Sequence, residues 1–173
     1  EQNIEIRQYE PMIIAEVDVE GKREDAIRDG FRLIADYIFG NNKVKLDIAM
    51  TSPVQQQESQ KIAMTAPVQQ QSTGRSWQIS FVMPSKYSME SLPEPNNDRV
   101  RLKEILTKKF VVIEFSGTNS NENITEHENK LMNYIAANKL KIIGSFKYAF
   151  YNAPWTLPFM RRNEVMIEIN QNF

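Results

Sequence analysis

Apolar and polar side chains alternate along residues 13–19, and Gly21 follows shortly after the alternation ends. The apolar members are Ile13, Ala15, Val17 and Val19. A period of two places them on one face of a β-strand and leaves the acidic residues between them on a solvated face. Pro11 precedes this strand and cannot donate to a strand ladder, so we expect a bend or a sheet edge there.

Four further segments show a strand pattern and no helical period. They are residues 77–83, 110–115, 142–150 and 164–169. Residues 84–99 hold three prolines and two adjacent asparagines. This composition favours a long exposed connection, which divides the chain near its middle.

The period changes to that of a helix in residues 22–40. The apolar residues at helical spacing are Ile27, Phe31, Ile34 and Ile38. They would form the buried stripe of an amphipathic helix. Gly40 is predicted to end this helix as its C-terminal cap.

A second helix is predicted over residues 124–140. Thr125 and Glu128 have the spacing of a capping box, which marks a helix start. The expected buried stripe consists of Leu131, Met132, Ile135 and Ala136. The order of strand, helix and strands thus recurs on both sides of the long connection.

This recurrence predicts a duplicated unit. We expect one α+β domain over residues 1–173, with pseudo-repeated halves of roughly residues 1–90 and 100–173. Strands of both halves would join in one mixed sheet, with the two helices packed on it. The two halves share a pattern of elements and no common motif.

A ten-residue phrase occurs twice, as IAMTSPVQQQ in residues 48–57 and as IAMTAPVQQQ in residues 62–71. The copies are predicted to form neighbouring strands that end in bends near Pro53 and Pro67, because proline fixes φ and lacks an N–H. Met50 and Met64 would alternatively line an apolar pocket, since methionine adapts to irregular ligands. The two interpretations are compatible, and the pattern does not choose between them.

The composition is that of an ordinary globular protein, with 41% hydrophobic residues and a net charge of −1. We therefore expect no nucleic-acid partner and no membrane span, because no apolar run approaches about 18 residues. A soluble protein is expected, in the cytoplasm or exported after loss of an N-terminal segment, since Glu1 stands where a methionine would start a chain.

Catalytic chemistry has little support in the sequence. The chain has no cysteine and a single histidine, His127, which excludes cysteine nucleophiles, Ser-His-Asp triads and histidine-rich metal sites. We expect no enzyme and no protein-bound metal. Glu164 is the best carboxylate for an enzyme, and the pattern places it as a solvated strand residue.

Four segments of the chain resemble the SOUL haem-binding protein family. They are IEIRQYEPMIIAEVDVEG, KIAMTAPV, FVMPSKYSMESLPEPNNDRVRL and YNAPWTLPFMRRNEVMIEI, which together span nearly the whole chain. The resemblance implies a distorted antiparallel β-barrel of about eight strands with two helices, built from two β-α-β-β halves. It also implies non-covalent binding of haem or another tetrapyrrole in an apolar groove, for transport or buffering. A related architecture in effector-binding domains offers the alternative of effector sensing or protein interaction without haem.

A hydrophobic small-molecule ligand is therefore the expected partner, and two segments are candidates for its site. Large aromatic residues in a proline-rich loop often cover a pocket, and arginines suit the carboxylates of a porphyrin. The candidate ligand-binding residues are Phe31, Ile34, Ile38, Met50, Met64, Trp155, Phe159, Met160, Arg161 and Arg162.

Structural roles for the same residues stay open. The helical stripe through Phe31 would belong to the core, and the aromatic residues would close one end of the barrel. The arginines would then pair with Glu164 or Glu168. Because His127 lies among carboxylates at a polar helix start, we expect haem binding to depend on the porphyrin rather than on a strong iron bond.

Overall fold

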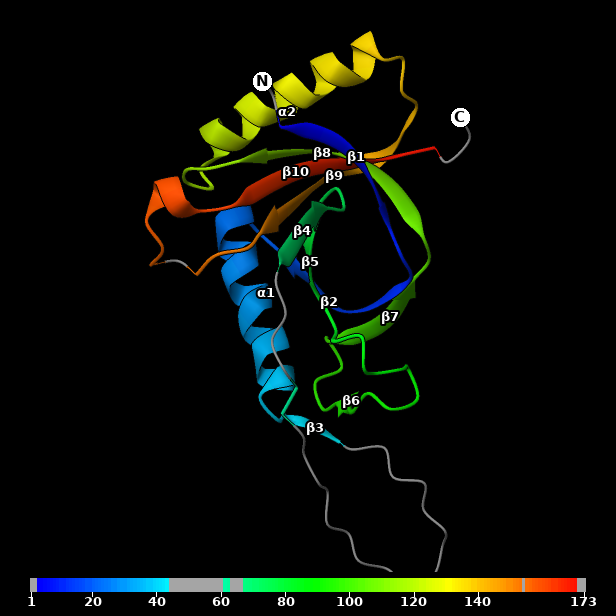
Figure 1. Cartoon of the computed structure of the whole chain (residues 1–173). Coiled ribbons are helices and arrows are strands. Elements are labelled where there is room, and N and C mark those ends of the chain that lie inside the picture. The colour runs from blue at the N-terminus through cyan, green and yellow to red at the C-terminus, as the bar shows by residue number, and fades with distance from the viewer. Residues whose placement is uncertain (1–2, 44–60, 63–66, 154, 171–173) are drawn as a thin grey trace, which may run out of the picture.

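The computed structural model describes residues 3–43, 61–62, 67–153 and 155–170, and it confirms an α+β fold with an eight-stranded sheet and two helices (Figure 1). The sheet contains β1 (Ile4–Tyr9), β2 (Met12–Glu20), β4 (Val68–Ser72), β5 (Ser76–Val82), β7 (Arg101–Ile105), β8 (Lys108–Phe115), β9 (Ile142–Phe150) and β10 (Asn163–Ile169). The helices are α1 (Arg23–Ile38) and α2 (Asn121–Ala137). Two short strands, β3 (Asn42–Lys43) and β6 (Glu94–Pro95), pair apart from the sheet, and η1 (Pro158–Met160) is one 3₁₀ turn.

The strand order reveals the internal duplication. The order is β1-β8-β10-β9-β4-β5-β2-β7, and every described pairing is antiparallel. The element pattern had suggested a mixed sheet, and this prediction is wrong because the described strands pair only in the antiparallel direction. The groups β2-α1-β4-β5 and β8-α2-β9-β10 have the same connectivity, and β4 and β9 join them at the centre.

The outermost strands are exchanged between the two groups. β1 pairs with β8, and β7 pairs with β2, so each group is completed by the strand that precedes the other. Neither outer strand was predicted. Their residues alternate weakly because both strands carry charged side chains and are largely exposed.

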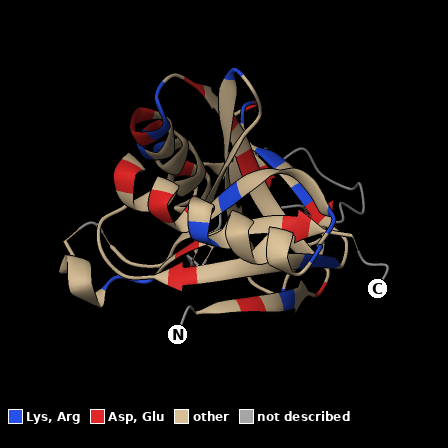
Figure 2. Cartoon of the chain, turned by 90° about the horizontal axis from the view of Figure 1, so that it is seen from above, with Lys and Arg blue, Asp and Glu red and all other residues tan. Residues whose placement is uncertain are grey.

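The strongly alternating segments are confirmed as strands, with boundaries within a few residues of those predicted. The prediction for residues 13–19 corresponds to β2, and Pro11 lies in the short bend between β1 and β2. The connection of residues 84–99 is confirmed apart from the two residues of β6. Acidic and basic residues are interspersed over the face seen in Figure 2.

Both helices lie on the outer side of the curved sheet (Figure 1). α1 packs on β2 and β5, and its residues Ile34 and Ile38 are completely buried. Gly30 lets the helix approach the sheet, because a Cβ atom there would lie 2.4 Å from Cγ1 of Ile79. Gly40 follows the helix with φ of 123°, which confirms it as the residue that ends α1.

α2 packs on β8 and β10 but begins earlier than predicted. Its N-cap is Ser120, whose hydroxyl accepts a hydrogen bond from the backbone N–H of Asn123 at 3.4 Å. The capping role predicted for Thr125 is wrong, because the helix begins at Asn121 and Thr125 lies beyond its first turn. The buried residues of α2 are Ile124, Leu131 and Ile135, whereas Met132 and Ala136 are exposed. The two exposed positions lie about 100° around the helix from the buried stripe.

Replacement of Ser120 by alanine is expected to lower the free energy of unfolding by about 1 kcal/mol, since an N-cap hydroxyl satisfies an otherwise unpaired N–H. Thr125→Ala is the matched control, and its effect should stay within about 0.5 kcal/mol because the side chain is exposed. Urea denaturation followed by circular dichroism measures both. A larger effect at Thr125 would restore the predicted cap.

The repeated phrase lies largely outside the described residues. This applies to its first copy and to residues 63–66, and therefore to Met50 and Met64 and to the predicted pairing of the copies. Ile62 is buried, and its N–H donates to the carbonyl of Ile38 at 2.8 Å. β4 begins directly after Pro67, so this proline precedes a strand.

Candidate ligand-binding site

The predicted aromatic loop forms an exposed apolar segment, which we define as Trp155–Met160. Trp155 is 86% exposed, Phe159 is 73% exposed and Met160 is 63% exposed. These exposures are high for such large apolar side chains, and their clustering is typical of an interaction site. The structure thus brings three of the predicted site residues together on the surface.

Backbone contacts hold this segment in place. The carbonyl of Pro158 accepts a hydrogen bond from the N–H of Gly117 at 2.9 Å. Within the segment, the N–H of Met160 donates to the carbonyl of Leu157 at 2.9 Å. Nε of Arg161 donates to the carbonyl of Thr156 at 2.7 Å. The apolar side chains are therefore presented by a backbone that already has hydrogen-bond partners.

The helical candidates contribute less surface. Ile34 and Ile38 lie in the core between α1 and the sheet. Phe31 is exposed in part, and its ring packs edge-on against Phe81 with centroids 5.5 Å apart. Of the three helical candidates Phe31, Ile34 and Ile38, only Phe31 is thus accessible to a ligand in this conformation.

The two arginines have protein partners. Nη2 of Arg162 contacts Oε1 of Glu164 at 2.7 Å, and Nε contacts Oε2 of Glu114 at 3.2 Å. The Arg162 guanidinium also lies over the ring of Tyr151, 4.5 Å from its centroid. The structural role foreseen for the arginines is therefore present at Arg162, while a ligand-orienting role stays a prediction.

Glu164 is completely buried, so its prediction as a solvated residue is wrong. It lies on β10, which β8 and β9 flank on both sides. Its carboxylate accepts hydrogen bonds from Nη1 of Arg7 at 2.7 Å and from the hydroxyl of Tyr151 at 2.9 Å. Burial raises the pKa of Tyr151, and the neighbouring Glu164 raises it further. We call Arg7, Tyr151, Arg162 and Glu164 the Glu164 cluster.

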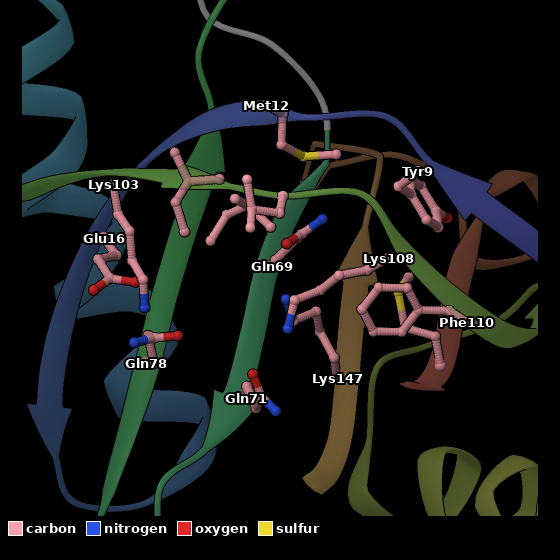
Figure 3. Close-up of a pocket in the computed structure, with 14 residues that line it drawn as sticks. Tyr9, Met12, Glu16, Gln69, Gln71, Gln78, Lys103, Lys108, Phe110 and Lys147 are labelled. Atoms are coloured by element: carbon pink, nitrogen blue, oxygen red, sulfur yellow. The ribbon is translucent and has the colours of Figure 1, made fainter. Parts of the chain in front are cut away.

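A second candidate site is a hollow in the concave face of the sheet, on the side away from both helices (Figure 3). The space between atoms in and above it amounts to about 670 Å³, part of which is open solvent. Its polar walls carry the lysines Lys103, Lys108 and Lys147, the glutamines Gln69, Gln71 and Gln78, and Glu16. Its apolar walls include Met12, Ile14, Ile105, Leu106, Phe110 and Met166.

This hollow was not predicted from the sequence, because polar strand residues were assigned to a solvated outer face. The signal was present in the alternation itself. On β2, Ile14 and Glu16 line the hollow, while Ala15 and Val17 belong to the core below α1. The face opposite the helices is therefore the inside of a curved sheet, and its polar residues converge.

His127 is half-buried on α2. Its ring stacks on Phe115 with centroids 4.0 Å apart, and Nδ1 lies 2.7 Å from the carbonyl of Asn123. Among the described residues, no group of three or more His, Cys, Asp or Glu side chains is placed to hold a metal ion. For a haem, the described residues thus offer apolar surface and an arginine, and His127 is already held by protein contacts.

The described helices include none with the length and apolarity needed to cross a bilayer. The fold defines the class of this protein as a duplicated strand-helix-strand-strand architecture with one curved sheet. The model of the SOUL heme-binding protein family matches residues 1–168. The chain belongs to this family.

Solved structures share the fold at low sequence identity. The C-terminal domain of EcmrR superposes with a TM-score of 0.70 and 8% identity, covering 99% of each chain. A hydrolase from Listeria innocua has a TM-score of 0.63 and 13% identity over 98% of this chain and 92% of its own. SAV2435 bound to tetraphenylphosphonium has a TM-score of 0.52 and 11% identity over 97% and 94%. Curated proteins yielded no match.

Proposed function

We propose that this chain acts as a single SOUL-type domain that binds haem or a related tetrapyrrole non-covalently and catalyses no reaction. The observation that carries the proposal is the exposed apolar segment Trp155–Met160 in a member of a heme-binding family. The flat faces of a porphyrin would cover these side chains. Burial of apolar area contributes about 25 cal/mol per Å², so it would supply most of the affinity.

Arg162 would orient the ligand. Its guanidinium is half exposed, and its Nε and Nη2 atoms are paired with Glu114 and Glu164. Within the described residues, Nη1 forms no hydrogen bond and can donate to a carboxylate of the porphyrin. Because Glu164 and Tyr151 already fix the guanidinium, this donor would be held in one orientation.

Iron would contribute little to the affinity. A bound haem would supply the redox and ligand-exchange chemistry of its iron. In this chain, His127 is the residue best suited to ligate iron, and its ring is stacked on Phe115 with one nitrogen at a backbone carbonyl. We therefore expect the porphyrin ring and its carboxylates to determine binding.

The test uses the two tryptophans of the chain separately. In Trp77→Phe, all tryptophan fluorescence comes from Trp155, and titration with haemin should quench it with saturation in the micromolar range. In Trp155→Phe, only Trp77 reports, and it should be quenched far less. Phe159→Ala should weaken binding by about tenfold, which is about 1.4 kcal/mol.

Iron-free porphyrin should bind within about tenfold of haemin. His127→Ala should leave the absorption spectrum of the haemin complex unchanged. An unrelated protein, titrated in parallel, reports haemin that adheres to any apolar surface. Quenching that does not saturate, or a low-spin spectrum that disappears in His127→Ala, would contradict the proposal.

Effector sensing without haem is the second candidate function. It is supported by the likeness of the fold to SAV2435, which was solved bound to the small molecule tetraphenylphosphonium. Titration of this cation beside haemin separates the two functions. Saturable binding of tetraphenylphosphonium with no saturable binding of either porphyrin would favour effector sensing.

A further inference from the structure

The concave hollow has the features of a second ligand site. All eight strands of the sheet contribute to its walls, and polar residues from neighbouring strands converge in it (Figure 3). An internal face that only served folding would be filled with apolar side chains or with paired polar groups. Several side chains in this hollow are polar and have no hydrogen-bond partner.

Polar groups without partners face the hollow. Glu16 is 5% exposed, and its Oε2 atom has no hydrogen-bond partner. Gln69 is also buried, and neither its side-chain amide nor that of Gln78 forms a hydrogen bond within the described part of the chain. Lys147 is partly buried and contacts the ring of Phe110, with Nζ 5.6 Å from the centroid.

The charges in the hollow do not balance. Lys108 is paired with Glu168 at 2.6 Å, and Glu16 lies 3.4 Å from Nη2 of Arg101. Lys103 and Lys147 have no carboxylate within ion-pair distance in the described structure. Two lysines thus remain uncompensated at one concave surface.

The environment of Lys147 disfavours its charge. Burial lowers the pKa of its ammonium group, and the nearby charge of Lys108 lowers it further, while the charges of Glu168 and Glu16 raise it and offset part of this lowering. A bound anion would reverse both effects, because it would supply an opposite charge and hydrogen-bond acceptors where water has been excluded.

The apolar walls determine what else the ligand must carry. Met12, Ile14 and Ile105 form one side, and Phe110 and Met166 form another. Leu106 stands at the mouth and is 73% exposed. A chain that extends from Lys147 toward Leu106 would therefore pass apolar side chains along its length.

We infer that the concave hollow binds an amphipathic carboxylate, whose charged head accepts hydrogen bonds from Lys147 and whose apolar body packs between Ile105, Phe110 and Met166. Lys103 adds a second positive charge, and the amides of Gln69 and Gln78 are further donors for the head. This inference does not depend on tetrapyrrole binding at Trp155–Met160.

The test is isothermal titration calorimetry of the full chain with decanoate, a single-chain carboxylate, and with decylammonium, its cationic counterpart. We expect saturable 1:1 binding of decanoate and much weaker binding of decylammonium. Lys147→Met should lower decanoate affinity about tenfold or more, equivalent to about 1.4 kcal/mol. Lys109→Met is the matched control, because Lys109 is the neighbour of Lys108 on β8 but does not line the hollow.

Folding is monitored independently. Lys147→Met removes a partly buried charge without an ion pair, so its melting temperature should equal or exceed that of the unmodified chain. If it fails to fold, Leu106→Asp serves instead, since this exposed position tolerates substitution and its new charge should repel decanoate. Haemin binding to either variant should be unchanged, which separates this site from Trp155–Met160.

Two results would overturn the inference. One is a failure of decanoate to follow the expected pattern: either it does not bind at all, or it binds equally well to Lys147→Met and Leu106→Asp. The other is preferential binding of decylammonium that Glu16→Gln abolishes, which would make the hollow a site for cations.

Discussion

Glu164→Ala is expected to lower the free energy of unfolding by about 3 kcal/mol, because two partly buried guanidinium groups lose the buried carboxylate that pairs with both of them. The carboxylate is 0% exposed and accepts hydrogen bonds from Arg7, Arg162 and Tyr151. The substitution would leave the guanidinium groups of Arg7 and Arg162 with Glu114, which is 37% exposed, as their one remaining shared anion in the described structure. Urea denaturation monitored by circular dichroism gives the value.

Glu168→Ala is the matched control for this prediction. Glu168 lies on the same strand and on the same face of the sheet, but it and its partner Lys108 are both partly exposed. Its loss should therefore cost about 0–1 kcal/mol, as is usual for solvent-accessible ion pairs. Replacement of the pair, as Arg7→Met with Glu164→Leu, should recover part of the loss. Equal costs at Glu164 and Glu168 would show that the Glu164 cluster contributes no more than a surface ion pair.

Gly30→Ala is expected to destabilise the protein by about 1–3 kcal/mol through overpacking, although alanine gains about 1 kcal/mol in intrinsic helix propensity. A Cβ atom at Gly30 would lie 2.4 Å from Cγ1 and 2.7 Å from Cβ of Ile79. These distances are too short for two carbon atoms, so α1 must shift away from β5. The same denaturation experiment measures the loss.

A second measurement of Gly30→Ala, made in a chain that also carries Ile79→Ala, tests whether the close contact with Ile79 is the cause. Ile79→Ala removes Cγ1, the atom nearest to the new Cβ, and retains only its own Cβ, so the cost of Gly30→Ala should be smaller there than in the unmodified chain. Arg32→Ala, on the exposed side of α1, should change stability by no more than about 0.5 kcal/mol. A stabilising Gly30→Ala would mean that helix propensity outweighs the close contact.

The sequence predicted the elements whose two faces differ in polarity. β2, β5, β8, β9 and β10 each place apolar residues toward a helix, and their alternation was sufficient to find them. β7 and β1 escaped prediction because a strand exposed at a sheet edge needs no apolar face. Gln70, in β4, turns toward α1 and donates to the carbonyl of Arg23 at 2.8 Å, a tertiary contact that a local pattern does not contain.

The candidate site was predicted in part. Proline and aromatic residues close together identified Trp155–Met160 as a loop with exposed apolar side chains, which is a local property. The concave hollow required the curvature of the sheet, because Lys103 and Lys147 come together only after strands distant in sequence have paired. For Glu164, a charged residue in a strand normally indicates a solvated position. Its burial depends on Arg7, 157 residues earlier in the chain.

The exchange of the outermost strands has a consequence for biosynthesis. β1 leaves the ribosome well before its partner β8, which lies more than a hundred residues later in the chain, with Ile4 opposite Ile113. Until β8 emerges, β1 has no strand to pair with, and β2 lacks the cover of β7. Such distant pairings slow folding, and unpaired edges are templates for other chains. Before β7 and β8 have been synthesised, the nascent chain therefore exposes unpaired strand edges, and this is when a chaperone would protect it most.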